Sequence, residues 1–225
     1  MKIKFLALSL ISTLSISGYS QTKRELGSFT KVTAFDKIEV HLVPSNVNKI
    51  ELSGTNSEQV ELINKDEELK VRMPLGKMLK GDEVVAIVYF KQLDAVEANE
   101  GSYIKSDETL KASLFDIIAK EGGKITIPVN ASKIAVKVSS GANVELAGKT
   151  QNIDVVATAG GTLEARKCDA EQATVTVNAG GEIYITAHEL VDAKARAGGN
   201  IVIHGNPKQV NQKTVLGGNI IVKKD

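Results

Sequence analysis

The chain has 225 residues, of which 42% are hydrophobic and only 4% aromatic, with no tryptophan. A chain of this length can bury a sizeable single core. Its 28 Lys and Arg residues and 27 Asp and Glu residues give a formal net charge of +1. Without a basic excess, nucleic acids and anionic membranes are poor candidates for partners.

Residues 1–20 have the layout of a secretory signal peptide. Residues 1–4 are basic, residues 5–16 form an apolar run too short for a membrane span, and Gly18 and Ser20 suit a cleavage site before Gln21. The residue directly after that site is not a cysteine, and no other segment has the length of a transmembrane helix, so neither a lipid anchor nor a membrane span is expected. We expect an exported chain, located in the periplasm, at the cell surface or in the medium.

Residues 29–90 contain several short alternations of apolar and polar residues, which predict β-strands. No glycine pair recurs in this region. We expect an antiparallel-like β region that covers the first coil of the repeats in residues 91–225, because a covered end protects open strand edges. Residues 21–225 then form one domain, with 29–90 as an N-terminal region or cap and 91–225 as repeats.

A pair of small residues, usually two glycines, recurs about every 19 residues in the second half of the chain. Apolar residues alternate with polar ones on both sides of each pair, which predicts two half-buried strands joined by a tight turn. Glycine accepts the positive φ that such turns use. The predicted turn glycines are Gly122, Gly123, Gly141, Gly160, Gly161, Gly180, Gly181, Gly198, Gly199, Gly217 and Gly218.

Each repeat also has a second connection, which is polar and irregular in sequence, at 147–151, 166–172, 187–190 and 205–209. One tight and one looser corner per repeat favour a β-solenoid. We therefore predict an all-β fold: a single-stranded, two-sheet β-solenoid (β-helix) with coils of about 19 residues, right-handed as β crossovers usually are. A β-sandwich or an antiparallel meander is the alternative.

Residues 32–40, Val-Thr-Ala-Phe-Asp-Lys-Ile-Glu-Val, and the glycine-turn repeats from about residue 93 resemble the auto-transporter adhesin, head GIN domain family of exported Bacteroidetes-type proteins. The resemblance covers nearly all of the chain after the signal peptide. It implies a two-sheet β-superhelix similar in outline to pectin-lyase-type helices, a role as an adhesin head, and a trimeric surface assembly. The family has no established catalytic residues, so the resemblance implies none.

The sequence offers little for catalysis or for a cofactor. His41, His188 and His204 are far apart and share no register, so no metal site is expected. Asp169 and Glu171 in a polar connection could serve polysaccharide hydrolysis, but the connections are too short to wall a cleft, and a solvated face is favoured.

Cys168 is the single cysteine and follows Arg166 and Lys167. These two cations could lower the pKa of its thiol and make it reactive. An ordinary loop or edge thiol is the favoured interpretation, because nothing else in the sequence points to thiol chemistry.

The flat face after the glycine turns is the candidate binding surface. It contains Tyr184, Asn200, Val202, Asn219 and Ile221: three form a mildly apolar stripe, and the two asparagines share a register position where their amides could stack. Scattered exposed apolar side chains are the alternative interpretation.

The sequence therefore predicts an exported, non-enzymatic protein for surface adhesion or an envelope scaffold, without cofactors. Another copy, a surface protein or a glycan is the expected partner. A carbohydrate-active enzyme or polysaccharide-binding β-helix is the alternative.

Overall fold

The computed structural model describes residues 22–223, and the predicted signal peptide lies outside the described residues. The nine N-terminal strands are β1 (Thr22–Glu25), β2 (Lys31–Ala34), β3 (Glu39–Pro44), β4 (Lys49–Gly54), β5 (Glu61–Lys65), β6 (Glu68–Arg72), β7 (Val84–Phe90), β8 (Ala95–Ala98) and β9 (Tyr103–Lys105). The others are β10 (Leu110–Ala119), β11 (Lys124–Val138), β12 (Asn143–Thr158), β13 (Thr162–Asn178), β14 (Glu182–Arg196), β15 (Asn200–His204), β16 (Gln209–Val215) and β17 (Asn219–Val222). Two short 3-10 turns, at Ser57–Gln59 and Leu75–Lys77, complete the described elements. None of the described residues belongs to a helix that could cross a membrane.

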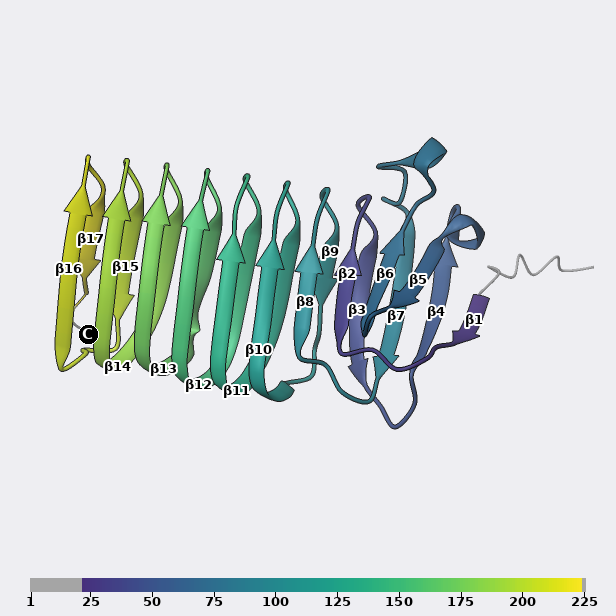
Figure 1. Cartoon of the computed structure of the whole chain (residues 1–225), viewed down its shortest axis with the longest axis horizontal. Helices are drawn as coiled ribbons and strands as arrows, with labels where there is room; N and C mark the ends of the chain where they lie inside the picture. The colour runs from purple at the N-terminus through teal and green to yellow at the C-terminus, as the bar shows by residue number, and fades with distance from the viewer. Residues whose placement is uncertain (1–21, 224–225) are drawn as a thin grey trace, which may run out of the picture.

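The strands form a β-solenoid whose coils stack in parallel along one axis (Figure 1). Each coil has a tight turn at the edge that is uppermost in Figure 1 and a wide corner at the opposite edge. We call the strand segments before each tight turn the pre-turn sheet and those after it the post-turn sheet. The first halves of β11–β14 lie in the post-turn sheet and their second halves in the pre-turn sheet, which confirms the predicted two-sheet coil of about 19 residues.

The tight turns explain why two small residues are needed. The first member of each pair takes a positive φ, such as 75° at Gly160, and the residue before it does so too. Two successive positive φ values are typical of a type I′ turn. The second member must be small for a different reason, because a Cβ on Gly161 would lie 2.5 Å from the carbonyl oxygen of Val138 in the preceding coil. All eleven predicted glycines lie at these turns.

The wide corners differ from the sequence interpretation. Irregular connections are expected from the sequence, but β11 to β14 each run for 15 to 17 residues through the corner without interruption. Small or apolar side chains such as Val129 and Ala170 point into the core there, so the corner is packed rather than looped. The backbone is irregular only at local register shifts, and between β15 and β16.

The N-terminal region is mixed rather than simply antiparallel. Strand β4 pairs in antiparallel fashion with β7 on one side and β1 on the other, and β5 pairs in the same way with β6, as expected for a cap. However, β2 and β3 pair in parallel with β8 and β9, so they form a regular solenoid coil. Asp36 and Lys37 make its tight turn with φ values of 59° and 64°, without a glycine pair to reveal it.

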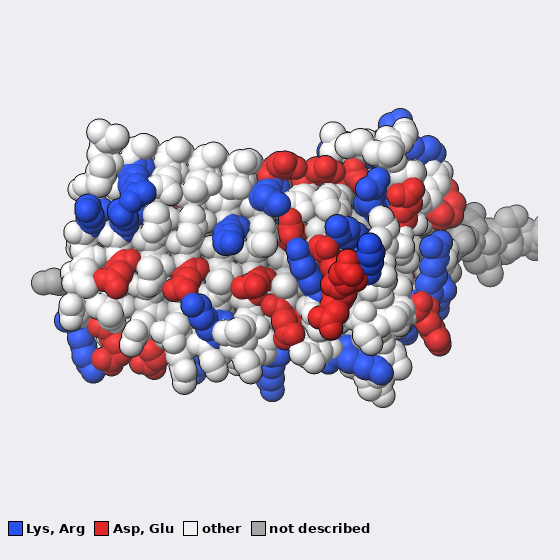
Figure 2. All heavy atoms as spheres, in the orientation of Figure 1, with Lys and Arg blue, Asp and Glu red and all other residues white. Residues whose placement is uncertain are grey.

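Charged side chains interlock over this N-terminal part, where Figure 2 shows acidic and basic residues side by side. The ammonium of Lys31 lies 2.6 Å from Glu97 and 3.1 Å from Glu68, and Lys120 lies 2.8 Å from Glu97. Burial raises the pKa of Glu97, but its bonds to Lys120 and Lys31 outweigh burial and hold that pKa at about 2. The first coils are thus joined across the stack by ion pairs.

Candidate binding face

The predicted apolar stripe is continuous in the structure. Tyr184 of β14 is the register partner of Val202 in β15, which in turn pairs with Ile221 in β17. Neighbouring strands lie about 4.8 Å apart, so the three side chains stand in one row on the outer side of the post-turn sheet. Tyr184 and Val202 are half-buried, whereas Ile221 is 45% exposed.

A row of polar side chains runs beside the stripe. The amide of Asn219 donates a hydrogen bond of 3.0 Å to the amide oxygen of Asn200, as their shared register predicted. The next residue in this row is Glu182, whose carboxylate accepts a hydrogen bond of 3.2 Å from the Tyr184 hydroxyl. These two bonds hold the asparagine amides and the Tyr184 hydroxyl in fixed positions.

Arg166 ends the stripe on the side of the earlier coils, and the sequence interpretation did not connect it with Tyr184. Its guanidinium bonds both carboxylate oxygens of Glu164, at 2.7 and 2.5 Å, and lies 5.3 Å from the centre of the Tyr184 ring. Hydrogen bonding from Arg166 lowers the pKa of Glu164. Burial, followed by the nearby charge of Glu182, raises the pKa of Tyr184, so its hydroxyl stays protonated at neutral pH.

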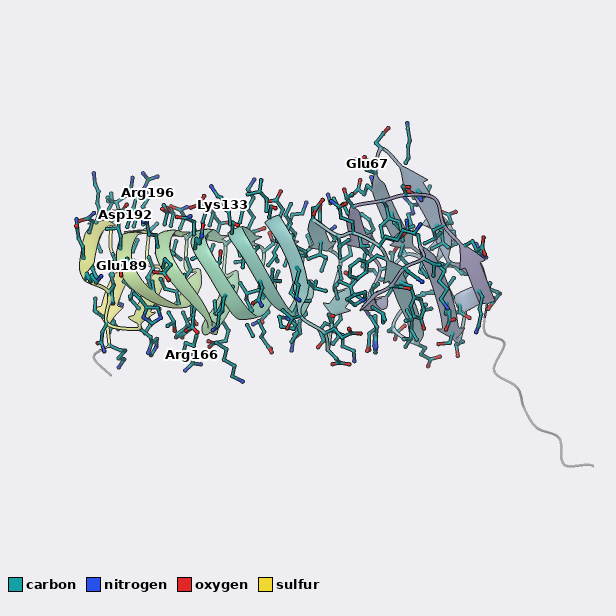
Figure 3. All side chains as sticks on the ribbon, turned by 90° about the horizontal axis from the view of Figure 1, so that it is seen from below. Glu67, Lys133, Arg166, Glu189, Asp192 and Arg196 are labelled. Atoms are coloured by element: carbon teal, nitrogen blue, oxygen red, sulfur yellow. The ribbon has the colours of Figure 1, made fainter. Side chains whose placement is uncertain are left out.

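A shallow hollow of about 630 Å³ adjoins this cluster on the same sheet. It is lined by Thr126, Ile127, Pro128, Glu145, Leu146, Ala147, Glu164, Arg166 and Lys167. Figure 3 shows Arg166 projecting from the side of the solenoid opposite to Lys133 and Asp192, which belong to the pre-turn sheet. The five predicted residues, Arg166 and this hollow therefore form one surface.

A second hollow, of about 600 Å³, follows the wide corners. Its lining includes Lys149, Asp169, Glu171 and His188, so these connections are more concave than their length suggested. His188 lies 3.7 Å from Asp169 and bonds the carbonyl oxygen of Gly205 at 2.9 Å. Asp169 and Glu171 are both exposed, unlike the desolvated carboxylic acid that glycosidases use as a general acid.

Cys168 is not a loop thiol. It lies on β13, faces the core and is only 2% exposed. Burial raises the pKa of its thiol to about 12, the opposite of the activation considered from its cationic neighbours. This thiol fills space at the wide corner opposite Gly148.

Metal-binding groups are dispersed in the part of the chain that the structure describes: no three His, Cys, Asp or Glu side chains gather as a metal would require. His41 lies 2.5 Å from the carboxylate of Glu39, and Lys105 shares that carboxylate at 2.8 Å, so this histidine is in an ion-paired cluster with a single carboxylate.

The fold and the glycine-turn repeats match a known family model. Residues 28–207 match the family described as "Putative auto-transporter adhesin, head GIN domain". This chain belongs to that family. The match begins before β2 and ends between β15 and β16, so it includes the N-terminal coil that lacks a glycine pair.

Solved structures share the architecture over nearly their whole length. A "putative adhesin" from Bacteroides fragilis NCTC 9343 superposes with a TM-score of 0.85 at 18% identity, covering 92% of this chain and 98% of that one. A "putative adhesin" from Parabacteroides merdae ATCC 43184 gives 0.75 at 19% identity, covering 93% and 98%. A "putative lipid binding protein" from Parabacteroides distasonis ATCC 8503 gives 0.69 at 12% identity, also covering 93% and 98%. At these identities the likeness shows the fold alone.

A search of curated proteins found no match to the chain. The adhesin names of the family and of the solved neighbours are consistent with a role in adhesion at the cell surface.

Proposed function

We propose that this protein is an exported, non-enzymatic adhesion module that contacts its target with the post-turn sheet of its last coils. The observation that carries the proposal is the register-aligned row of Tyr184, Val202 and Ile221. The row combines a tyrosine with branched apolar side chains on a rigid sheet, and it is flanked by amides and by Arg166. Tyrosine and arginine are enriched at the centres of binding surfaces, where neighbouring polar groups add specificity.

Rigidity supports this role. The side chains of the row stand on strands that are hydrogen-bonded to neighbouring coils, and Tyr184 is held between Glu182 and Arg166. A surface that is already ordered loses little conformational entropy when it binds. A row spaced by coils also offers repeated contacts to an extended target on the surface of a neighbouring cell or of the envelope.

The test compares two valines on opposite faces of the same solenoid. A deletion strain is complemented with the wild type, with Val202→Ser, or with Val156→Ser, whose side chain is 41% exposed on the pre-turn sheet. We expect deletion and Val202→Ser to reduce attachment to surfaces or partner cells at least fivefold, and Val156→Ser to leave attachment unchanged. Equal attachment of all strains would refute the proposal.

Polysaccharide processing at the wide-corner hollow is a second candidate, favoured only by its size and its Asp169 and Glu171 lining. Incubation of the purified chain with a polysaccharide panel tests it through new reducing or unsaturated ends. Such ends, lost in the double variant Asp169→Asn/Glu171→Gln, would replace the non-enzymatic proposal.

A further inference from the structure

The C-terminal end of the solenoid presents two open strand edges. Strand β16 pairs with β14 on one side and β17 pairs with β15, and no strand of the described chain lies on their other sides. Val210 and Ile220, which occupy core-facing positions, are only partly buried, and Val222 is 37% exposed. At the opposite end, β1, β4 and β5 cover the first coils. An open edge with apolar side chains is a template for strand pairing.

We propose that a second copy of this chain covers this end, with β16 and β17 pairing with their own counterparts across a two-fold axis. The axis crosses β16 at Gln212 and β17 at Ile221. Counted from the tight turn centred on Leu216 and Gly217, these two residues are equally far along the chain. One axis perpendicular to the strands can therefore cross both, and it makes both new pairings antiparallel.

The register about this axis matches core with core and surface with surface. On β16, Val210 lies opposite Thr214 of the second copy, and on β17 Ile220 lies opposite Val222 of the second copy. Strands present alternate residues to opposite faces, so only pairs whose residue numbers sum to an even value keep both inner faces together. An axis through Gln212 and Ile221 meets this condition on both strands.

The charges of the end agree with the same register. Residues 205–223 contain three lysines and no carboxylate. Lys208 is already paired with Glu189 at 2.7 Å. The axis sets Lys213 opposite Asn211 of the second copy and Lys223 opposite Asn219 of the second copy, so each lysine faces an amide rather than another lysine. Directly opposed like charges, which destabilise paired strands, are thus avoided.

A closed two-fold contact also fits the common geometry of protein assemblies. Stacking of one copy's C-terminal end on the N-terminal end of the next would be heterologous and would continue into fibres. The two-fold contact stops at two copies. It would also join the two apolar rows at Ile221, so that the candidate binding face runs unbroken across the dimer, although the contact itself does not depend on the adhesion proposal.

The first test is the mass of the purified chain, residues 21–225, in solution by light scattering after size exclusion. We expect twice the mass of one chain at micromolar concentration. The variant Gln212→Glu sets two carboxylates against each other on the axis, so we expect at least a tenfold weaker dimer at pH 8 with an unchanged circular dichroism spectrum. A monomer, a trimer, an open-ended series of masses, or a dimer unaffected by Gln212→Glu would overturn the proposal.

Cross-linking tests the register itself. Residues directly opposite on antiparallel strands have Cα atoms about 4.5–5.5 Å apart, within the range that a disulfide spans. We expect Gln212→Cys to form a covalent dimer in a glutathione redox buffer. Lys213→Cys is the matched control, because its counterpart lies diagonally, at roughly 7–8 Å. The native Cys168 is buried and does not compete. Equal cross-linking of both variants, or of neither, would contradict the register.

Discussion

The first coils and the glycine repeats reach the same tight turn by different chemistry. In the repeats, Gly160 supplies a positive φ and Gly161 leaves room for the carbonyl of the coil before it. In the first coil, Asp36 accepts hydrogen bonds from the backbone N–H groups of Met73 at 3.0 Å and Leu79 at 2.8 Å. The absence of a side chain permits the tight turn in the repeats, whereas a buried carboxylate stabilises the tight turn in the first coil.

The two kinds of turn leave different traces in the sequence. A steric requirement selects one residue type and leaves a visible period. A hydrogen-bonded requirement can be met by contacts with distant segments. In the turn between β8 and β9, for example, the hydroxyl of Ser102 donates a hydrogen bond of 2.9 Å to the carbonyl oxygen of Ala34. Single substitutions can destabilise each kind of tight turn separately.

Removal of the Asp36 carboxylate should have the largest effect. Asp36→Ala leaves two backbone N–H groups of the cap without their acceptor, and we expect a loss of about 3 kcal/mol in the free energy of unfolding. Asp36→Asn keeps one acceptor oxygen and should lose about half as much. Urea unfolding followed by circular dichroism measures both. Equal stability of Asp36→Ala and the wild type would show that the turn does not depend on this carboxylate.

The two glycines of one pair should differ in their sensitivity. Gly161→Ala brings a methyl against the backbone of Val138 and should cost about 2 kcal/mol. Gly160→Ala has open space and bears only the strain of a positive φ, about 1 kcal/mol. Ala142 occupies the second position of another turn and is buried there. The reverse order in parallel urea titrations would contradict the separate roles of the two positions.

The ion pairs of the first coils predict a pH dependence. The pKa of Glu97 is about 2 in the folded chain and near 4.5 in the unfolded chain, so its contribution is present above pH 4.5 and disappears as the pH falls to 2. After allowance for solvent screening, we expect Glu97 to contribute about 1.5 kcal/mol to the free energy of unfolding at neutral pH. Glu97→Gln should therefore be less stable than the wild type at pH 7 and equal to it near pH 2.

A matched control lies among the repeats. Glu164 also has a lowered pKa, but its partner Arg166 is exposed, so Glu164→Gln should change stability at pH 7 by less than about 0.5 kcal/mol. Equal losses in the two glutamine variants would mean that the N-terminal network is an ordinary surface ion pair.

The sequence predicted the solenoid, its period and the row of Tyr184, Val202 and Ile221, because strand alternation and glycine spacing are local patterns. It did not predict that Asp36 closes a coil, because the partners of that carboxylate lie about 40 residues away. Nor did it predict the surroundings of Cys168 and Arg166. The coil between Gly161 and Gly181 has one extra residue, and a register shift after Ala165 absorbs it. That shift turns Cys168 inward and leaves Arg166 over Tyr184.

The assignment of the binding face can be tested on a surface that the wild-type strain colonises and the deletion strain does not. The experiment measures the affinity of the purified chain for that surface. The wild type is compared with Tyr184→Ser/Val202→Ser and with the matched double variant Thr176→Ser/Val156→Ser on the opposite sheet. We expect the first variant to lose at least tenfold in affinity and the second to bind like the wild type. Equal binding of all three proteins would contradict the assignment of this face.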